Sequence, residues 1–171
     1  MFKPWRLANS LDQLRKQINA LAPNRNKASD GTIGDAAHAT GTSDHNPDAN
    51  RVVKALDITH DPEGGCNCNL LAQSLVDSKD FRVQYIIWNS QISNADPKGG
   101  KPSWAWRKYT GSNPHNKHIH ISVRNNPNTY DSTSPWVIRI NNNPPPISQP
   151  ITQPQTSEHW FRRFLRWLFG V

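Results

Sequence analysis

The first regular pattern in the chain is a run of apolar residues at helical spacing. Ser10 followed by Gln13 has the form of a capping box, which favours a helix that begins at Ser10. Pro23 cannot continue a helix, so the helix should end just before it. The apolar positions that would face a core are Leu11, Leu14, Ile18 and Leu21.

Three later segments combine β-branched and aromatic residues with a two-residue alternation, which predicts strands. They are residues 52–59, Val83–Trp88 and residues 117–123, with residues 137–140 as a candidate short edge strand. Residues 69–79 predict a second helix. Residues 24–51 and the stretch around Gly99 and Gly100 are polar and predict loops, with one short helix near residues 35–39. This order of elements predicts an α+β fold with a small antiparallel sheet flanked by helices.

The composition of the chain changes at Asn141. Residues 141–157 are rich in Pro, Gln, Asn and Ser and should form an extended linker, which leaves one folded domain over residues 1–140. Residues 158–171 predict a basic amphipathic helix, because Arg162, Arg163 and Arg166 share one side of a helical wheel and the Trp, Phe and Leu side chains share the other. Such a helix suits an anionic membrane surface. Docking on the folded domain is the alternative interpretation.

The chain is basic, with a formal net charge of +7, which favours anionic partners without choosing among them. We see neither an apolar run of signal-peptide length nor a stretch of about twenty apolar residues. We therefore expect a protein that is made in the cytoplasm and that needs another route out if it acts outside the cell. Cys66 and Cys68 are poorly spaced for a mutual disulfide and too few for a four-thiolate zinc site, so we expect thiols in a loop or at a helix start.

Candidate chemistry lies in three places: the Ser-Asp-His segment 43–45, Asp57 near the end of a predicted strand, and the histidine-rich segment 115–120. Alternation along the last predicted strand puts His118 and His120 on one face, about 7 Å apart, with the isoleucines on the other face. Two imidazoles and one carboxylate suit Zn²⁺ and leave a fourth position for water. Zinc lowers the pKa of bound water and polarises a carbonyl group, and hydrolysis of a peptide bond needs both effects.

This order of motifs resembles the M15-type D-alanyl-D-alanine peptidases and the related murein endopeptidases. The resemblance covers roughly residues 10–124, and SDHNPD, ALDITHD, YIIWN and NPHNKHIHISV are similar to phage-associated members described as endolysins or carboxypeptidases. It implies that residues 1–140 form a zinc peptidase domain with the metal ligands His45, Asp57 and His120. It also implies that His118 orients the water or stabilises the oxyanion.

Two features depart from the pattern of that family. His45 and Asp57 lie twelve positions apart, farther than in the best-known members, so a hairpin or a wider loop must bring them together. Lys117 stands where many members carry a carboxylate as general base. The murein endopeptidase branch has a histidine at the position of His115, which makes His115 the candidate base. Asp48 is the alternative.

Five further residues are expected to contact the substrate. Ser43 and Asp44 precede His45 and would hold the substrate or the imidazole, although capping of the loop is the structural alternative. Trp88 and Trp106, together with Asn89, suit the walls of a cleft for a glycan-linked peptide. Packing in the core is the alternative for Trp88.

The sequence therefore predicts zinc-dependent hydrolysis of a peptide bond in bacterial peptidoglycan, by an endopeptidase or carboxypeptidase of the phage-lysis kind. The D-Ala-D-Ala bond, the L-Ala-D-Glu bond and the crosslink to a diamino acid are all compatible substrates. Two other functions were weighed, a metal-dependent nuclease and an inactive module that binds the cell wall. No dense cluster of Lys and Arg surrounds the histidines, so no specific nucleic-acid partner is expected. The complete ligand set argues against an inactive module.

Overall fold

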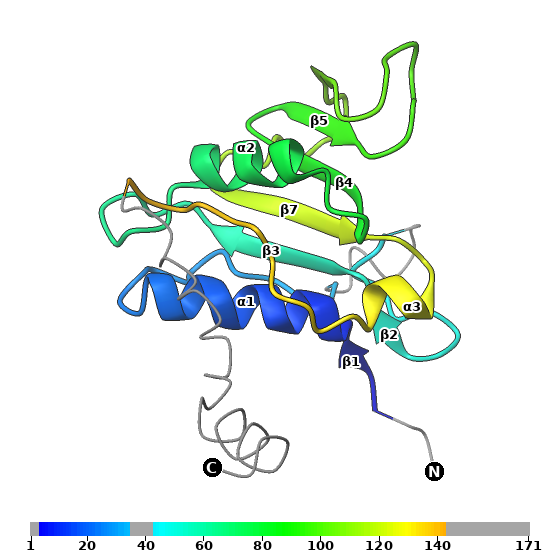
Figure 1. Ribbon diagram of the computed structural model, residues 1–171, viewed down its shortest axis with the longest axis horizontal. Helices are drawn as coiled ribbons and strands as arrows, with labels where there is room; N and C mark the ends of the chain where they lie inside the picture. Colours follow the sequence, from blue (N-terminus) through cyan, green and yellow to red (C-terminus); the bar gives the residue numbers. More distant parts are fainter. Residues whose placement is uncertain (1–3, 35–42, 143–171) are drawn as a thin grey trace, which may run out of the picture.

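The computed structural model describes residues 4–34 and 43–142, which build a mixed fold of helices and sheets (Figure 1). Five antiparallel strands form the main sheet in the order β3-β7-β4-β5-β6, and β1 pairs with β2 in a separate parallel ladder. The main strands are β3 (Ala55–Thr59), β4 (Val83–Trp88), β5 (Gln91–Asn94), β6 (Trp106–Lys108) and β7 (His118–Val123). The expected α+β class and its antiparallel sheet are confirmed.

Two helices cover one face of this sheet, and together with it they enclose the core. Figure 1 shows α1 (Asn9–Leu21) and α2 (Cys68–Ser78) in front of the sheet, with α1 along β3 and α2 along β7 and β4. The predicted apolar positions Leu11, Leu14 and Ile18 are fully buried, whereas Leu21 stays 36% exposed at the end of α1. The buried side chains of the sheet that meet the helices are Leu56, Ile58, Ile86, Ile119, Ile121 and Val123. The opposite face of the sheet is therefore left for polar groups.

The start of α1 differs from the expected capping box. Ala8 is the N-cap residue and no side chain caps the helix, while Ser10 lies inside the first turn and is fully buried. The backbone N–H of Ala8 donates to the carbonyl of Val53 at 2.9 Å, and the indole of Trp136 donates to the carbonyl of Ser10 at 2.8 Å. Tertiary contacts thus fix where this helix begins, and they override the local capping signal. The helix ends before Pro23, as expected.

The predicted strand over residues 52–59 is interrupted at Lys54. Residues Val52–Val53 form β2, which pairs with β1 (Arg6–Leu7), and the chain then enters the main sheet as β3. The backbone of Lys54 joins the two parts, because its N–H donates to the carbonyl of Asp44 at 3.0 Å and its carbonyl accepts from Val123 at 3.0 Å. One continuous strand was therefore wrong, and the break ties the segment around Asp44 to the sheet.

Three further elements differ from the sequence predictions. The polar stretch after β4 contains β5 and β6, and the short helix α3 (Pro127–Tyr130) follows β7. Asn89 and Ser90 both have positive φ, 47° and 62°, as a two-residue hairpin turn between β4 and β5 requires. Residues 137–140 form no strand. These residues run between α1 and α2 (Figure 1). Ile140 is buried there, and its carbonyl accepts from the backbone N–H of Asn67 at 2.7 Å.

Several predictions fall on residues that the structure does not describe. These are the short helix near residues 35–39, nearly all of the linker over residues 141–157, and the basic amphipathic helix over residues 158–171. In the described part of the chain, no helix combines the length and the apolar character needed to cross a bilayer. Cys66 and Cys68 are buried free thiols, and Cys68 is the first residue of α2, as expected for a helix-start thiol.

Candidate metal centre

The face of the sheet away from the helices carries the histidines. Asp57 on β3 is the direct register partner of His120 on β7, and Ile87 on β4 is the partner of His120 on its other side. Because side chains alternate along a strand, His118 shares this face with His120, whereas Ile119 and Ile121 enter the core. Two adjacent strands thus bring an aspartate and two histidines together across a distance of some sixty residues in sequence.

The three expected metal ligands lie in contact with one another. His45 reaches over the sheet from the preceding loop, and its Nε2 lies 3.3 Å from Oδ2 of Asp57 and 3.1 Å from Nδ1 of His120. Nδ1 of His120 lies 3.0 Å from Oδ1 of Asp57. One ligand atom from each residue lies within 4.8 Å of the other two, so this group can hold a metal ion. The eleven residues between His45 and Asp57 contain a turn, β2 and the start of β3, and they supply the wider loop that the sequence required.

The backbone around His45 fixes which of its nitrogens faces the ligands. Nδ1 lies 2.7 Å from the carbonyl oxygen of Thr32. A carbonyl oxygen only accepts hydrogen bonds, so Nδ1 carries the proton and donates it. In the neutral ring Nε2 then holds a lone pair, and this lone pair points at Asp57 and His120. That arrangement is typical of a histidine ligand held by an outer hydrogen bond.

A chain of three side chains fixes His120 in the same way. The hydroxyl of Ser122 donates to Oδ2 of Asp44 at 2.9 Å, and the hydroxyl of Tyr85 donates to the same oxygen at 2.8 Å. The hydroxyl of Ser122 has one proton, which it donates to Asp44. It can therefore only accept a hydrogen bond from Nε2 of His120, which lies 3.0 Å away. Nδ1 of His120 therefore holds the lone pair. Asp44 therefore supports the imidazole of His120 from behind, through the hydroxyl of Ser122.

Three acceptors consequently face one another: the lone pairs of His45 and His120 and the carboxylate of Asp57. Such a group favours an extra proton or a cation between its members. The pKa of His45 agrees with an extra proton at this position. Burial opposes a charge on His45, but the hydrogen bond and the charge of Asp57 raise the pKa of His45 above the usual value. Burial likewise opposes ionisation of Asp57, yet hydrogen bonds from His120 and His45 hold the pKa of Asp57 well below its usual range. The centre is built to neutralise positive charge.

Asp57 also depends on a glycine on the outer side of β3. Gly31 pairs with Asp57 through two backbone hydrogen bonds, donating at 3.2 Å and accepting at 2.8 Å. A Cβ at position 31 would lie 3.0 Å from Oδ2 of Asp57, which is closer than ordinary packing allows. The close approach of this backbone locks Asp57 in place without filling the space that its carboxylate needs.

His118 lies beside the three ligands without joining them. Its Nε2 is 3.7 Å from Oδ2 of Asp57, beyond hydrogen-bond distance, and it is buried with no hydrogen-bond partner in the described residues. Burial lowers the pKa of His118, so the ring is neutral at neutral pH. An unpaired buried nitrogen next to the ligands is a group poised for a substrate atom.

His115 faces the same space from a loop above the sheet. Its ring lies 5.1 Å from that of His118 and 5.4 Å from that of His120, and burial lowers its pKa to about 4. Nδ1 donates to the carbonyl of Asn113 at 2.7 Å, which leaves a lone pair on Nε2. The backbone is held in a left-handed conformation (φ 52°) because the N–H of Asn89 donates to the carbonyl of His115 at 3.0 Å.

The ligands and both additional histidines line one cavity of about 460 Å³. Its floor is the histidine face of β3, β4 and β7. One wall runs along the loops that carry Gly31 and Ser43, and the other along the segment from Tyr109 to His115. Ser43 lines this cavity, and its hydroxyl also accepts from the backbone N–H of His45 at 3.3 Å, which is the capping contact weighed as the alternative. The cavity is large enough for a small segment of a peptide.

The expectation that Trp88, Asn89 and Trp106 line the metal cleft was wrong. Trp88 is 8% exposed and lies on the helix side of β4, where its indole donates to Oδ1 of Asn69 at 2.9 Å. All three residues line a different depression, about 230 Å³ in volume, next to α2. The reason is alternation along β4, which sends Tyr85 and Ile87 to the histidine face and Ile86 and Trp88 to the helices.

Sequence reasoning missed four contributors to the site: Gly31, Thr32, Tyr85 and Ser122. The strand pattern contained the signal for two of them. Ser122 follows His118 and His120 at every second position of β7, and Tyr85 lies on the histidine face of the neighbouring strand. Asp48, the alternative base, lies outside the cavity and pairs with Lys54 at 3.1 Å while it caps the turn before β2.

No family model, curated protein or solved structure matches this chain. The chemistry of the centre therefore rests on its own geometry. That geometry consists of three converging acceptors able to hold a metal ion, two neutral histidines beside them, and a cavity in front of all five.

Proposed function

We propose that this protein is a zinc-dependent hydrolase that cuts a peptide bond in bacterial peptidoglycan. The observation that carries the proposal is the convergence of His45, Asp57 and His120 at one cavity, with one ligand atom from each residue within 4.8 Å of the other two. Two imidazoles and one carboxylate, with an open cavity in front, suit a catalytic zinc site better than a closed structural site. Zinc bound there would activate a water molecule and polarise the scissile carbonyl group.

The residues of the chain supply the remaining steps. Nε2 of His118 is unpaired and next to the ligand group, so it can donate a hydrogen bond to the carbonyl oxygen as negative charge develops on it. His115 is neutral at neutral pH, and its Nε2 lone pair can accept the proton of the attacking water. The pKa of His115, about 4, is close to that of an ordinary carboxyl group. In many members of the resembling family a carboxylate is the general base, and Lys117 stands at its position in this chain.

Outer residues keep the ligands in register during turnover. The chain from Nε2 of His120 through Ser122 to Asp44 holds the imidazole with its lone pair forward, and Thr32 does the same for His45. Such partners orient ligands and raise their basicity. Peptidoglycan as the substrate rests on the motif order that resembles the murein peptidases, together with a peptide-sized cavity.

The deciding experiment is digestion of purified peptidoglycan by the full-length protein with zinc, followed by mass spectrometry of the products. Release of new amino groups and of one defined muropeptide product is the expected result, and the product identifies which of the three candidate bonds is cut. Metal analysis of the purified protein should give one zinc per chain. Nicking of plasmid DNA without release of wall peptides would replace this proposal with a nuclease, and wall binding without cleavage would replace it with an inactive module.

A further inference from the structure

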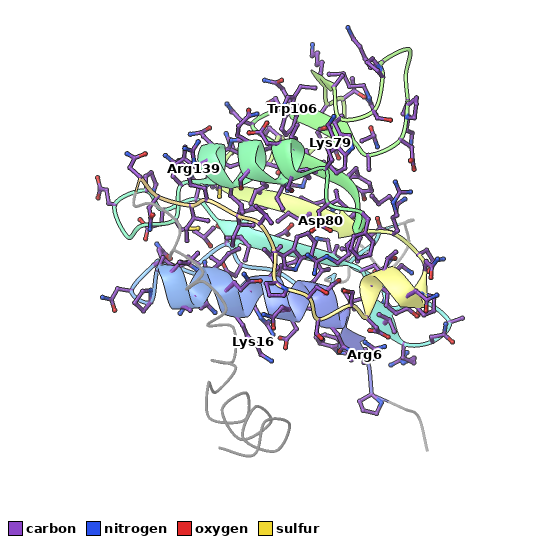
Figure 2. The ribbon with its side chains drawn as sticks, in the orientation of Figure 1. Arg6, Lys16, Lys79, Asp80, Trp106 and Arg139 are labelled. Atoms are coloured by element: carbon purple, nitrogen blue, oxygen red, sulfur yellow. The ribbon has the colours of Figure 1, made fainter. Side chains whose placement is uncertain are left out.

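A second depression, separate from the metal cavity, lies where α2 meets the β4–β5 hairpin. It has a volume of about 230 Å³ and is lined by α2, by the end of β4 and the turn after it, and by Gln91 and Trp106. Figure 2 labels Trp106 beyond α2, at the β5 side of the sheet. The depression is smaller than the usual site for a drug-sized ligand, so it suits a single ring or a group of similar size.

The chemistry of its lining is neutral. Two indoles, of Trp88 and Trp106, provide apolar surface, and the other side chains that reach it are one alanine and four exposed amides. None of the lining residues carries a charge, so the depression lacks the cations that a phosphate or a nucleic-acid backbone requires. Flat aromatic surface combined with uncharged hydrogen-bonding groups fits a neutral ring with polar substituents.

The amides offer both donors and acceptors. Oδ1 of Asn69 accepts from the indole of Trp88 at 2.9 Å, which leaves its NH₂ group to donate. Nε2 of Gln73 donates to Asp77 at 2.7 Å, which leaves its oxygen to accept. A sugar hydroxyl and an N-acetyl group each need partners of both kinds. The two internal hydrogen bonds also hold these amides in fixed orientations before any ligand arrives.

The depression adjoins the catalytic loop through one residue. The side chain of Asn89 lines the depression, while its backbone N–H donates to the carbonyl of His115 at 3.0 Å. Next to it, the N–H of Ser90 donates to the carbonyl of Pro114 at 2.7 Å. A two-residue turn therefore separates the second depression from the loop that brings His115 to the metal cavity. Because Trp88 lies on the helix side of β4 and the metal cavity lies on the opposite face, a ligand that fills both sites must pass around this turn and carry a ring covalently joined to a peptide.

We propose that this depression binds one N-acetylated sugar ring of the glycan strand, namely the sugar region next to the peptide that occupies the metal cavity. This inference rests on the proposed peptidoglycan substrate and adds a glycan subsite to it. One face of the sugar stacks on Trp106, and Asn69 and Gln73 pair with its polar substituents.

The first test is binding of soluble N-acetylglucosamine oligomers to the full-length chain, followed by NMR of the tryptophan indole N–H groups. A saturable shift of the Trp106 signal is expected. Trp106→Ala should weaken binding by about tenfold and Gln73→Ala, an exposed position, by about threefold. Trp5→Ala is the matched control, because Trp5 is 38% exposed and lies outside the depression, and it should bind like the unaltered chain. Absence of a saturable shift, or unchanged binding by both test variants, overturns the inference.

The second test separates this inference from the proposed function. Hydrolysis is compared on peptide stems that carry their sugars and on the same stems freed of sugar. Trp106→Ala and Gln73→Ala should lower kcat/KM for the sugar-bearing stems and leave the sugar-free stems unchanged, whereas an equal loss on both contradicts the subsite. If the unaltered chain cuts neither substrate, the proposed function fails, and the binding measurement alone decides whether the sugar site exists.

Discussion

Two partly buried aspartates, Asp30 next to the end of β3 and Asp57 on β3, are neutralised in different ways. Asp30 receives two hydrogen bonds from the fully buried guanidinium of Arg25, at 2.8 and 2.5 Å, and two more from the backbone and hydroxyl of Thr59. Asp57 faces only imidazoles, and its nearest partners are His120 at 3.0 Å and His45 at 3.3 Å. Arginine keeps its charge at every relevant pH, whereas a histidine loses its charge near neutrality.

This difference separates a structural acid from a candidate metal ligand. Asp30 is paired with Arg25 and Thr59, which keep their protons at every relevant pH. It therefore holds the segment around Arg25 onto the end of β3. Asp57 is paired by groups whose positive charge depends on a proton, so a metal ion can take the place of that proton. The two aspartates are similar in burial, and only the identity of their hydrogen-bond partners distinguishes them.

The largest expected effect is the loss of activity in Asp57→Asn. Removal of the anionic ligand should abolish stoichiometric zinc and lower peptidoglycan hydrolysis by at least about 10³-fold. The metal-free variant should also melt below the metal-free parent near neutral pH. Burial opposes ionisation of Asp57, but the hydrogen bonds from His120 and His45 lower the pKa of Asp57 in the folded state, so the ionised carboxylate stabilises the fold. Metal analysis and thermal melts check this prediction. A variant that keeps zinc would remove Asp57 from the ligand set.

Asp30→Asn should have the opposite effect on zinc binding. Arg25 would stay buried without its counter-charge, so the free energy of unfolding should fall by about 3 kcal/mol. Zinc should still bind at one per chain at a temperature where the variant is folded. Urea unfolding and metal analysis of the same sample make the comparison, and loss of zinc from the folded variant would contradict the division between the two acids.

The pairing of Asp30 with Arg25 predicts that the free energy of unfolding depends on pH. Burial opposes ionisation of Asp30, but the hydrogen bonds from Arg25 and Thr59 lower its pKa below the unfolded value of about 3.8. The group with the depressed pKa therefore contributes stability above the unfolded pKa, and this contribution is lost as the pH falls through the folded pKa. Asp30→Asn should flatten the acid side of the stability curve.

His118→Ala tests the neutral histidine beside the ligands. The side chain makes no contact within hydrogen-bond distance of Asp57, so zinc should stay bound. Loss of one hydrogen bond to the developing oxyanion should lower kcat by about 10²–10³-fold, with little change in KM. His120→Ala, by contrast, should lose zinc and activity together. If His118→Ala strips the metal and His120→Ala does not, the roles along β7 are reversed.

The smallest expected effect concerns the partner behind His120. Ser122→Ala removes the acceptor that keeps the proton on Nε2, which should weaken zinc binding by about 10–100-fold without abolishing it. Ser93→Ala is the matched control, because Ser93 is also fully buried in the sheet but its hydroxyl has no partner in the described residues. Competition with a zinc-binding dye measures both variants. If both variants bind zinc with equal affinity, Ser122 does not determine which nitrogen of His120 carries the proton.

The sequence predicted the parts of this molecule that depend on local pattern. Of the four apolar positions that helical spacing predicted for the core face of α1, three are buried, and alternation predicted β4 and the two faces of β7. The candidate ligand set of His45, Asp57 and His120 came from the resemblance in motif order. The β5 and β6 strands were missed because QISN and WRK are short and mixed in polarity. The helix start at Ser10 failed for a different reason, since partners far along the chain, such as Trp136, decide it.

The aromatic residues failed because their order in the chain was taken as a guide to their position in space. Trp88 follows Ile87 directly, but a single step along a strand reverses the side-chain direction. Applied to β4, the same alternation that correctly paired His118 with His120 would have placed Tyr85 at the site and Trp88 away from it.

The position of β7 has a consequence for the order in which the site forms during synthesis. Among the strands that the structure describes, β7 is the last to be made, yet it lies between β3 and β4 in the sheet. Until residues 118–123 have emerged, β3 has no strand beside it in the main sheet, and Asp57 has no register partner. Pairings between distant segments form slowly because the long loop must close first. A nascent or shortened chain therefore carries no assembled ligand set, and the domain should begin to bind metal only after its sheet is closed.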